Sequence, residues 1–323
     1  MKPFALERPA TLREAAKLTL DGAGQPLGGG TDLLGMIKAN IDQPARLVDI
    51  TGLTELAGWT SDARGIRIGG AAPLGDLERS SELAGELPII AQALRDLASP
   101  QLRNMGTVAG NLLQQNRCWY FRDEGVPCWH KGGQECFALS GDSRFHAILG
   151  VQTCMMVAPS DLAPALLAYD ATVELRSTYG TRRIPLQELY QVPGGPLRSE
   201  LAIFPGEILV ALRIPRAALK RTGTFHKQMR RGGWSFAVVS VAASARVARG
   251  KLKDVRIVAG GIAAFPWRVP AAEQVLEGRK PDDAACAEAA ALFVEDAKTK
   301  PDNAYKVPLT TEVVKRALQS LVG

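Results

Sequence analysis

The sequence predicts an α+β protein with more than one domain. Its 323 residues exceed what one hydrophobic core usually holds, and 46% of them are apolar, enough for several cores. Short strand-like and helical segments alternate over the first two thirds, whereas the last third contains three strand-like segments followed by helices. We therefore expect three segments, residues 1–55, 56–215 and 221–323, with a cysteine-bearing insertion at about 115–155.

Composition and charge narrow the class of protein. Charged residues make up 22% of the chain, the net charge is +6, and the basic residues are scattered. Nucleic-acid binding is therefore a weak hypothesis, and a basic face that meets an acidic partner subunit fits the charge equally well. The sequence contains no run of 18 apolar residues, which a membrane-spanning helix would need. Residues 1–8 lack the apolar stretch of a signal peptide. We expect no membrane span and no export signal in this chain.

The first segment is predicted to be a small unit of helices and strands. Thr11 and Glu14 form a capping-box pattern that starts a helix over residues 12–20. Residues 47–50, with the sequence Leu-Val-Asp-Ile, indicate a strand.

A run of three glycines, residues 28–30, carries the first chemical signal. The glycines permit positive φ and close backbone approach, and Thr31 or Asp32 can cap the helix that follows. Exposed N–H groups in such a loop can bind a pyrophosphate. The pattern is not the Rossmann fingerprint, since Leu33 stands where a third glycine is needed, and no Gly-Lys-Ser/Thr follows. A flexible loop before a helix is the alternative.

The second segment is predicted to hold further strands and helices around a second glycine-containing loop. That loop, residues 106–111, is rich in small residues and ends in Asn111, so it can either approach a ligand or form an ordinary turn. The expected strands are residues 65–69, 148–157, 172–176, 181–185 and 208–214, and the expected helices are residues 88–98 and 161–168.

The third segment is predicted to be a sheet followed by helices. Strands are expected over residues 224–229, 236–247 and 252–261, and helices over residues 270–278, 283–298 and 310–321. Cys286 lies in an alanine-rich helical stretch, which indicates a small buried residue.

Four of the five cysteines lie within 37 residues and are spaced C-x9-C-x7-C-x17-C: Cys118, Cys128, Cys136 and Cys154. Such clustering in a chain with no earlier cysteine favours metal ligation. Structural zinc sites usually contain close cysteine pairs, which are missing here, so an iron–sulfur cluster is favoured over zinc, disulfides or inert thiols. His130 and His146 lie in the same window and are alternative ligands, although ordinary surface or core histidines are the simpler interpretation.

Taken together, these motifs resemble the FAD-binding medium subunit of the xanthine dehydrogenase and molybdenum hydroxylase family. The resemblance extends from about residue 1 to 320 in consistent order. The stretches that carry it are residues 27–34, 106–112, 159–163, 225–227 and 260–263.

The cysteine insertion narrows the resemblance. It is similar to the insertion in the FAD subunit of bacterial periplasmic aldehyde oxidoreductases, which carries a [4Fe–4S] cluster, and secondly to that of the 4-hydroxybenzoyl-CoA reductase β subunit. The shared stretches are residues 101–104, 110–114, 117–118, 127–128 and 143–147. This resemblance implies that the four cysteines are cluster ligands.

The family resemblance implies a fold, a cofactor and its binding residues. The fold would be a two-part FAD-binding domain of the vanillyl-alcohol-oxidase (PCMH) type, followed by a C-terminal α/β domain of the CO dehydrogenase flavoprotein type. Lys227 would approach the isoalloxazine ring, and Trp234 replaces a tyrosine common in relatives. The residues implied to bind FAD are Gly28, Gly29, Gly30, Thr31, Asp32, Leu33, Thr107, Gly110, Asn111, Ser160, Asp161 and Lys227.

The resemblance also implies a function. The chain would be the electron-transfer subunit of a heterotrimer, with a molybdenum-cofactor large subunit, a [2Fe–2S] small subunit and an external electron acceptor. No residue of this chain is expected to be catalytic. Alternatives are a medium subunit of a 4-hydroxybenzoyl-CoA reductase or a xanthine dehydrogenase-type enzyme, a free-standing flavin reductase, or a metal-pinned interaction module without flavin. We expect the compartment to be the periplasm, by co-export with a partner, or the cytoplasm.

Overall fold

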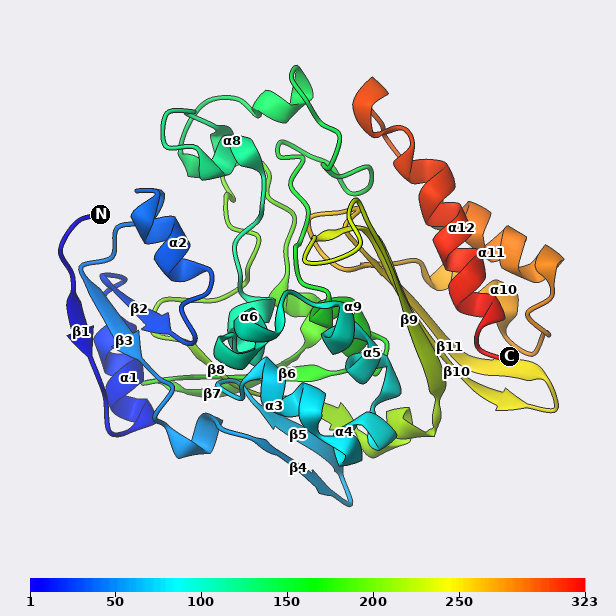
Figure 1. Ribbon diagram of the computed structural model, residues 1–323, viewed down its shortest axis with the longest axis horizontal. Helices are drawn as coiled ribbons and strands as arrows, with labels where there is room; N and C mark the ends of the chain where they lie inside the picture. The colour runs from blue at the N-terminus through cyan, green and yellow to red at the C-terminus, as the bar shows by residue number, and fades with distance from the viewer. Residues whose placement is uncertain (323) are drawn as a thin grey trace.

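Three β-sheets organise the chain in the computed structural model, which describes residues 1–322 (Figure 1). The N-terminal sheet is parallel, in the order β1-β3-β2. Its strands are β1 (Ala5–Glu7), β2 (Gly24–Leu27) and β3 (Arg46–Asp49), and its helices are α1 (Leu12–Thr19) and α2 (Leu33–Lys38). The predicted cap of α1 is confirmed, because Thr11 Oγ1 accepts from the Glu14 N–H at 3.2 Å.

The central sheet is antiparallel, in the order β4-β5-β8-β6-β7. Short helices cover it, and α5 directs Ile89, Ile90, Ala93 and Leu94 into the core. The strands are β4 (Trp59–Asp62), β5 (Gly65–Gly69), β6 (Thr172–Ser177), β7 (Gly180–Pro185) and β8 (Ile208–Pro215). The helices are α3 (Leu74–Arg79), α4 (Ser81–Glu86), α5 (Pro88–Asp96), α6 (Pro100–Met105), α7 (Val108–Leu112) and α9 (Leu162–Leu167).

The C-terminal sheet is antiparallel, in the order β12-β11-β10-β9, and three helices pack on one face of it (Figure 1). The strands are β9 (Thr222–Met229), β10 (Ala237–Ala248), β11 (Lys251–Gly260) and β12 (Trp267–Arg268), and the helices are α10 (Pro270–Leu276), α11 (Asp283–Val294) and α12 (Lys306–Gln319). Cys286 is fully buried in α11, as predicted. Among residues 1–322, no helix is both long and apolar enough to span a membrane.

The insertion between α7 and α9 is built mostly from turns and lies apart from the sheets, with α8 at the top of the view (Figure 1). It contains α8 (Trp119–Arg122) and the 3-10 helices η2 (Trp129–Lys131) and η3 (Phe137–Leu139). The strand predicted over residues 148–157 is wrong. A turn at Gly150, with φ of +61°, interrupts the segment. The N–H groups of Ile148 and Leu149 both donate to the carbonyl of Ile262, so no regular strand pairing forms there.

Contacts on two sides hold the insertion. On the N-terminal side, Asn40 Nδ2 donates to Glu124 Oε2 at 3.0 Å. On the C-terminal side, the Lys306 ammonium, fully buried at the start of α12, donates to the carbonyls of Phe145, His146 and Gly261 at 2.7–3.0 Å. The insertion is therefore held between the first and third sheets.

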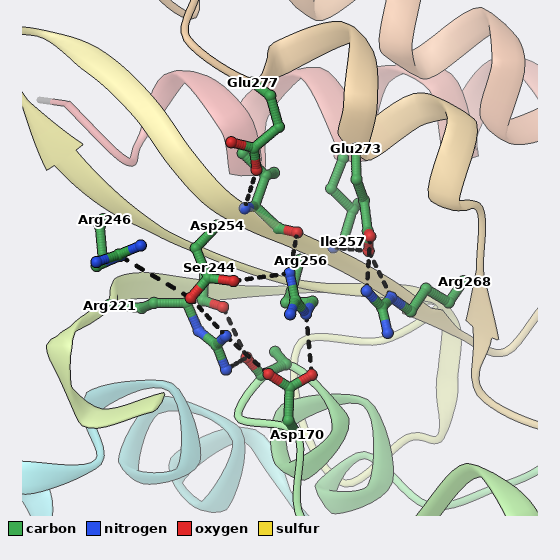
Figure 2. A network of polar contacts seen from close by, with 12 residues as sticks. Asp170, Arg221, Ser244, Arg246, Asp254, Arg256, Ile257, Arg268, Glu273 and Glu277 are labelled. Atoms are coloured by element: carbon green, nitrogen blue, oxygen red, sulfur yellow. Dashed lines mark hydrogen bonds and ion pairs between the residues drawn. The ribbon is translucent and has the colours of Figure 1, made fainter. Parts of the chain in front are cut away.

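An ionic network joins the end of α9 to the C-terminal sheet (Figure 2). Arg221 donates to Asp170 at 2.8 Å and to Asp254 at 3.1 Å, and Arg256 also contacts both carboxylates. Burial raises the pKa of Asp170, but the hydrogen bonds and charges of Arg256 and Arg221 outweigh burial and bring this pKa below its usual value.

Replacing Arg221 by Met is expected to lower the free energy of unfolding by about 1–3 kcal/mol, because the hydrogen bonds of the buried guanidinium to Asp170 and Asp254 are lost while Arg256 still contacts both carboxylates. The Arg221 side chain is only 1% exposed. In the wild type, the stabilisation from Asp170 is present above the pKa of an unfolded aspartate and is lost as the pH falls through the lowered folded-state pKa. Urea unfolding between pH 3 and 7 measures both effects. Arg95→Met, on the exposed face of α5, is the control, and equal stability of the two variants would contradict the prediction.

Candidate cofactor cavity and cysteine cluster

Two connected cavities lie between the first two sheets and β9. Cavity A, of about 1200 Å³, adjoins β2 and the glycine run, and cavity B, of about 700 Å³, reaches α5 and β9. The residues that line both cavities are Thr31, Asp32, Thr107, Gly110 and Gln114. The two cavities therefore adjoin at the narrow wall that the two glycine loops form between them.

The amide groups of the first glycine loop face this narrow region without partners. Within residues 1–322, the N–H groups of residues 28–32 donate to no protein acceptor. Gly30 has φ of +70°, which allows the chain to turn there. Consecutive free N–H groups ahead of a helix form a concave site for an anion.

The two glycine loops touch each other closely. A Cβ atom on Gly29 would lie 1.5 Å from the carbonyl oxygen of Met105, and one on Gly28 would lie 2.7 Å from Thr107 Oγ1. Neither position has room for a side chain. The close approach requires glycine, which gives the predicted run a physical reason.

Most of the residues predicted to bind the cofactor line this space. Those in cavity A or B are Gly28, Gly29, Gly30, Thr31, Asp32, Leu33, Thr107, Gly110, Asn111, Asp161 and Lys227. Ser160 lines neither cavity. Its Oγ donates to Asn111 Oδ1 at 2.7 Å and accepts from the Ala163 N–H at 3.0 Å, so Ser160 positions Asn111 and caps α9.

Asp32 has a structural partner that the sequence did not reveal. It occupies the N-cap position of α2 but makes no side-chain capping bond. Its carboxylate instead contacts Arg117 and Arg122, each at 2.9 Å, and accepts from the Gln115 N–H at 2.8 Å. Asp32 therefore links the glycine loop to the start of the cysteine insertion.

Lys227 and Asp161 form a buried pair in the wall of cavity B. Lys227 Nζ donates to Asp161 Oδ2 and to the carbonyl of Asp96, both at 2.8 Å, and the two side chains are 1% and 6% exposed. Burial raises the pKa of Asp161, and the charge and hydrogen bond of Lys227 oppose that rise. The carboxylate of Asp161 therefore offsets the positive charge of Lys227, a partner that the resemblance did not reveal.

Replacing Lys227 by Met is expected to lower the free energy of unfolding at pH 7 by about 3–5 kcal/mol, because the Asp161 carboxylate would be buried without its partner. Without Lys227, which lowers the pKa of Asp161 against the rise caused by burial, this pKa rises further in the variant, and the loss should shrink as the pH falls through that higher pKa. Urea unfolding at pH 7 and at pH 5 measures this. The exposed Lys220→Met is the control, and a loss below about 1 kcal/mol would be incompatible with a buried pair.

Trp234 lines cavity B from the turn between β9 and β10. It is 72% exposed and has φ of +57°, an uncommon conformation for a large side chain. Phe236 lines the same cavity, and the guanidinium of Arg117 lies 4.7 Å from its ring centroid. Aromatic rings therefore border the open side of cavity B.

The four clustered cysteines surround a separate cavity, cavity C, of about 260 Å³. Cys118, Cys128 and Cys136 each stand directly before a short helical turn, namely α8, η2 and η3. The backbone N–H groups of Phe121 and Tyr120 act to lower the pKa of the Cys118 thiol, although burial raises this pKa by more. Such N–H groups favour thiolates over thiols.

The pKa values of these thiols reflect burial and mutual proximity. Burial raises the pKa of Cys118 to about 11. A hydrogen bond from the Cys154 thiol lowers the pKa of Cys136 to about 6, while that bond and burial raise the pKa of Cys154. Metal binding must therefore displace protons, which makes it dependent on pH.

The two histidines of the insertion lie close to the cysteines. Within residues 1–322, no three His, Cys, Asp or Glu side chains are placed to hold one ion together. His130 lines cavity C, and its Nε2 pairs with Glu200 at 3.0 Å, whereas His146 Nε2 lies 3.2 Å from Cys118 Sγ. Both imidazoles are buried beside the cysteines, so the surface interpretation of these histidines is wrong.

Sequence reasoning missed Asn116, which is 1% exposed and lines cavity C. It also missed Arg117 and Gln114 in the wall of cavity B. All three residues lie within four positions before Cys118, and this proximity to a predicted ligand could have indicated them.

Comparisons with known proteins agree with the geometry of cavities A and B. A family model described as the FAD binding domain in molybdopterin dehydrogenase matches residues 2–217. A second, described as the CO dehydrogenase flavoprotein C-terminal domain, matches residues 224–321.

Relatives and solved structures support the same assignment. The aldehyde oxidoreductase FAD-binding subunit PaoB of Escherichia coli (strain K12) is 39% identical over 280 residues, which are 85% of this chain and 86% of that protein. The xanthine dehydrogenase FAD-binding subunit of Escherichia coli O157:H7 is 28% identical over 84% of this chain and 78% of its own length. A chain of reconstituted CO dehydrogenase from Oligotropha carboxidovorans has the same fold, with a TM-score of 0.78 at 24% identity over 99% of this chain and 98% of its own.

These matches confirm the predicted fold, an FAD-binding domain followed by a C-terminal domain of the CO dehydrogenase flavoprotein type. They also confirm FAD as a cofactor of this domain. The chain therefore belongs to the family of FAD-binding medium subunits of the molybdenum hydroxylases, which are multi-subunit oxidoreductases.

Proposed function

We propose that this chain is the electron-transfer subunit of a molybdenum-containing aldehyde oxidoreductase and that it carries both FAD and a [4Fe–4S] cluster. The most direct support for the aldehyde substrate class is the 39% identity to an aldehyde oxidoreductase subunit over most of both chains. The observation that carries the two-cofactor assignment is that one chain holds an elongated cavity with free amide donors and a separate cavity surrounded by four cysteines.

The residues of cavities A and B fit FAD. Bound FAD supplies the acceptance and release of two electrons. The free N–H groups of residues 28–32 would donate to the pyrophosphate at the narrow region, and the two cavities would receive the two ends of the dinucleotide. The paired Lys227 and Asp161 would line the ring end of the site and exclude water from it.

The residues of cavity C fit a polynuclear cluster better than zinc. A [4Fe–4S] cluster supplies one-electron transfer and takes one cysteine on each iron, so its ligands stand farther apart than those of a single tetrahedral ion. The four cysteines surround one space but are not placed to share one ion. The N–H donors behind the sulfurs compensate thiolate charge.

The rest of the reaction belongs to partner subunits in this proposal. A large subunit with the molybdenum cofactor would oxidise the aldehyde, a small subunit with [2Fe–2S] clusters would deliver the electrons, and an external acceptor would remove them from this chain. Relatives named medium chains, such as that of the carbon monoxide dehydrogenase of Hydrogenophaga pseudoflava, support a three-subunit arrangement. A xanthine dehydrogenase-type enzyme is the second candidate, favoured by the 28% identical relative.

The test is an anaerobic ultraviolet–visible spectrum of the purified full chain before and after dithionite, with FAD, iron and sulfide analysis. Flavin bands on a broad absorbance, with iron and sulfide in equal amounts, are expected. Flavin bands without iron would overturn the cluster assignment, and zinc in place of iron would support the mononuclear alternative. A colourless chain that takes up no FAD would leave the interaction module as the better account.

Aldehyde specificity needs the assembled enzyme. Co-expression with the molybdenum-cofactor large subunit and the [2Fe–2S] small subunit should give a complex that oxidises aldehydes. The isolated chain should not oxidise aldehydes. Turnover of xanthine and not of aldehydes by that complex would favour the second candidate.

A further inference from the structure

Asn116 lines cavity C, and hydrogen bonds fix the orientation of its side-chain amide. Asn116 Oδ1 accepts from the Cys118 N–H at 3.1 Å, and the Asn116 carbonyl accepts from Arg122 Nε at 2.8 Å. The orientation of the amide is therefore determined, because only its oxygen can accept from an N–H group. Asn116 Nδ2 is buried and has no hydrogen-bond partner in the protein.

A buried amide N–H without an acceptor is uncommon and calls for an explanation. Asn116 is 1% exposed and lines the cavity that the four cysteines surround. A loaded cavity would offer sulfur atoms as acceptors, either thiolate or inorganic sulfide.

His146 approaches the same cluster of thiols from the opposite end of the insertion. Its Nε2 lies 3.2 Å from Cys118 Sγ, and its ring meets Trp119 edge to face at a centroid distance of 5.0 Å. The Lys306 ammonium holds the carbonyl of His146 at 3.0 Å. A metal-bound thiolate carries no proton, so this contact is a hydrogen bond only when Nε2 donates.

His130 differs from these two residues. Its Nε2 donates to the buried carboxylate of Glu200 at 3.0 Å, so this nitrogen is not available to a sulfur atom. His130 is therefore left out of the donor set.

We infer that Asn116 and His146 donate N–H···S hydrogen bonds to the cluster held by the four cysteines and thereby raise its reduction potential. The inference rests on the cluster assigned in the proposed function. Reduction adds negative charge to the cluster and its thiolates, and donors aimed at sulfur stabilise that charge. Removing either donor should make the midpoint potential more negative while the four ligands remain.

The experiment is a redox titration of the full chain, followed by the electron paramagnetic resonance signal of the reduced cluster. Asn116→Leu removes the donor without adding charge. His146→Phe removes a donor, and His146→Gln returns an N–H group to a similar place. His226→Phe is the matched control, since His226 lies on β9 and contacts Ser320 rather than cavity C.

The expected result is a more negative potential for Asn116→Leu and His146→Phe, a potential near the wild-type value for His146→Gln, and no change for His226→Phe. Iron and FAD content should be unchanged in all four. Wild-type potentials in both Asn116→Leu and His146→Phe, at full iron content, would overturn the inference.

A measurement on the wild-type chain tests the same inference if the variants fail to assemble the cluster. Pulsed electron paramagnetic resonance of the reduced cluster should detect exchangeable deuterons after transfer to D₂O, and nitrogen couplings that change with ¹⁵N-histidine labelling. Absence of the histidine coupling would remove His146 from the donor set, and absence of both would overturn the inference. A wild-type chain with flavin but no iron defeats the cluster assignment itself, and the inference falls with it.

Discussion

The variant Gly29→Ala is expected to bind FAD at least about 100-fold more weakly than the wild type, a loss of about 3 kcal/mol. The added Cβ would lie 1.5 Å from the Met105 carbonyl oxygen, so the two glycine loops would have to separate. Separation would misplace the free N–H groups of residues 28–32, which are the proposed donors to the pyrophosphate. Fluorescence titration of the FAD-free chain measures the dissociation constant.

Gly35→Ala provides a matched control for this prediction. Gly35 lies inside α2, directly after the glycine loop, and a Cβ there would meet no atom within 4 Å. Alanine in a helix interior is favoured over glycine by roughly 0.5–1 kcal/mol, so this variant should be as stable as the wild type or more stable, with unchanged FAD affinity. Equal FAD affinity of Gly29→Ala and the wild type would show that the glycine loops do not hold the cofactor.

The variant Cys128→Ala is expected to lose nearly all iron and sulfide while it retains FAD. Cys128 is 5% exposed and lines cavity C but neither cavity A nor cavity B. Loss of one thiolate leaves three ligands for a cluster that takes four, and the affinity should fall steeply. Iron and acid-labile sulfide per chain, with FAD released by heat, give both quantities from one preparation.

Cys286→Ala is the control for the cysteine prediction. Cys286 is the one cysteine outside the cluster and is fully buried in α11. Its replacement should cost a small amount of stability and no iron. Full iron content in Cys128→Ala would contradict the ligand assignment, and equal iron loss in the two variants would indicate unfolding and not ligand removal.

Much of the architecture was predictable because its signals are local. Alternating apolar residues predicted the hairpin of β6 and β7 and the long strands β9 to β11, and alanine-rich periodicity predicted α11. The strand predicted over residues 148–157 was wrong because this apolar segment has an irregular backbone. Its N–H groups at residues 148 and 149 donate to the carbonyl of Ile262 and not to a neighbouring strand.

The sequence also indicated which residues belong to the two candidate sites, but not which side chains pair with one another. Three adjacent glycines and four spaced cysteines mark the two candidate sites through residue type alone, whereas the choice among their possible ligands rested on the family resemblance. The sequence could not state that Asp32 pairs with Arg117 and Arg122, that Lys227 is neutralised by Asp161, or that Ser160 serves Asn111. The family resemblance had implied a role at the cofactor for Lys227, Ser160 and Asp161, but not their contacts with one another or with Asn111.

The sequence by itself therefore determined the fold class, the two loops that meet at the cofactor cavity and the cysteine set. Only the tertiary structure decided which polar groups are free and which are consumed by partners. Asp32 and Arg122 are 90 positions apart, Lys227 and Asp161 are 66 apart, and His146 and Cys118 are 28 apart. Whether a buried polar group is satisfied depends on neighbours that the folded chain brings within about 3 Å, and no local pattern in a single sequence encodes those distances.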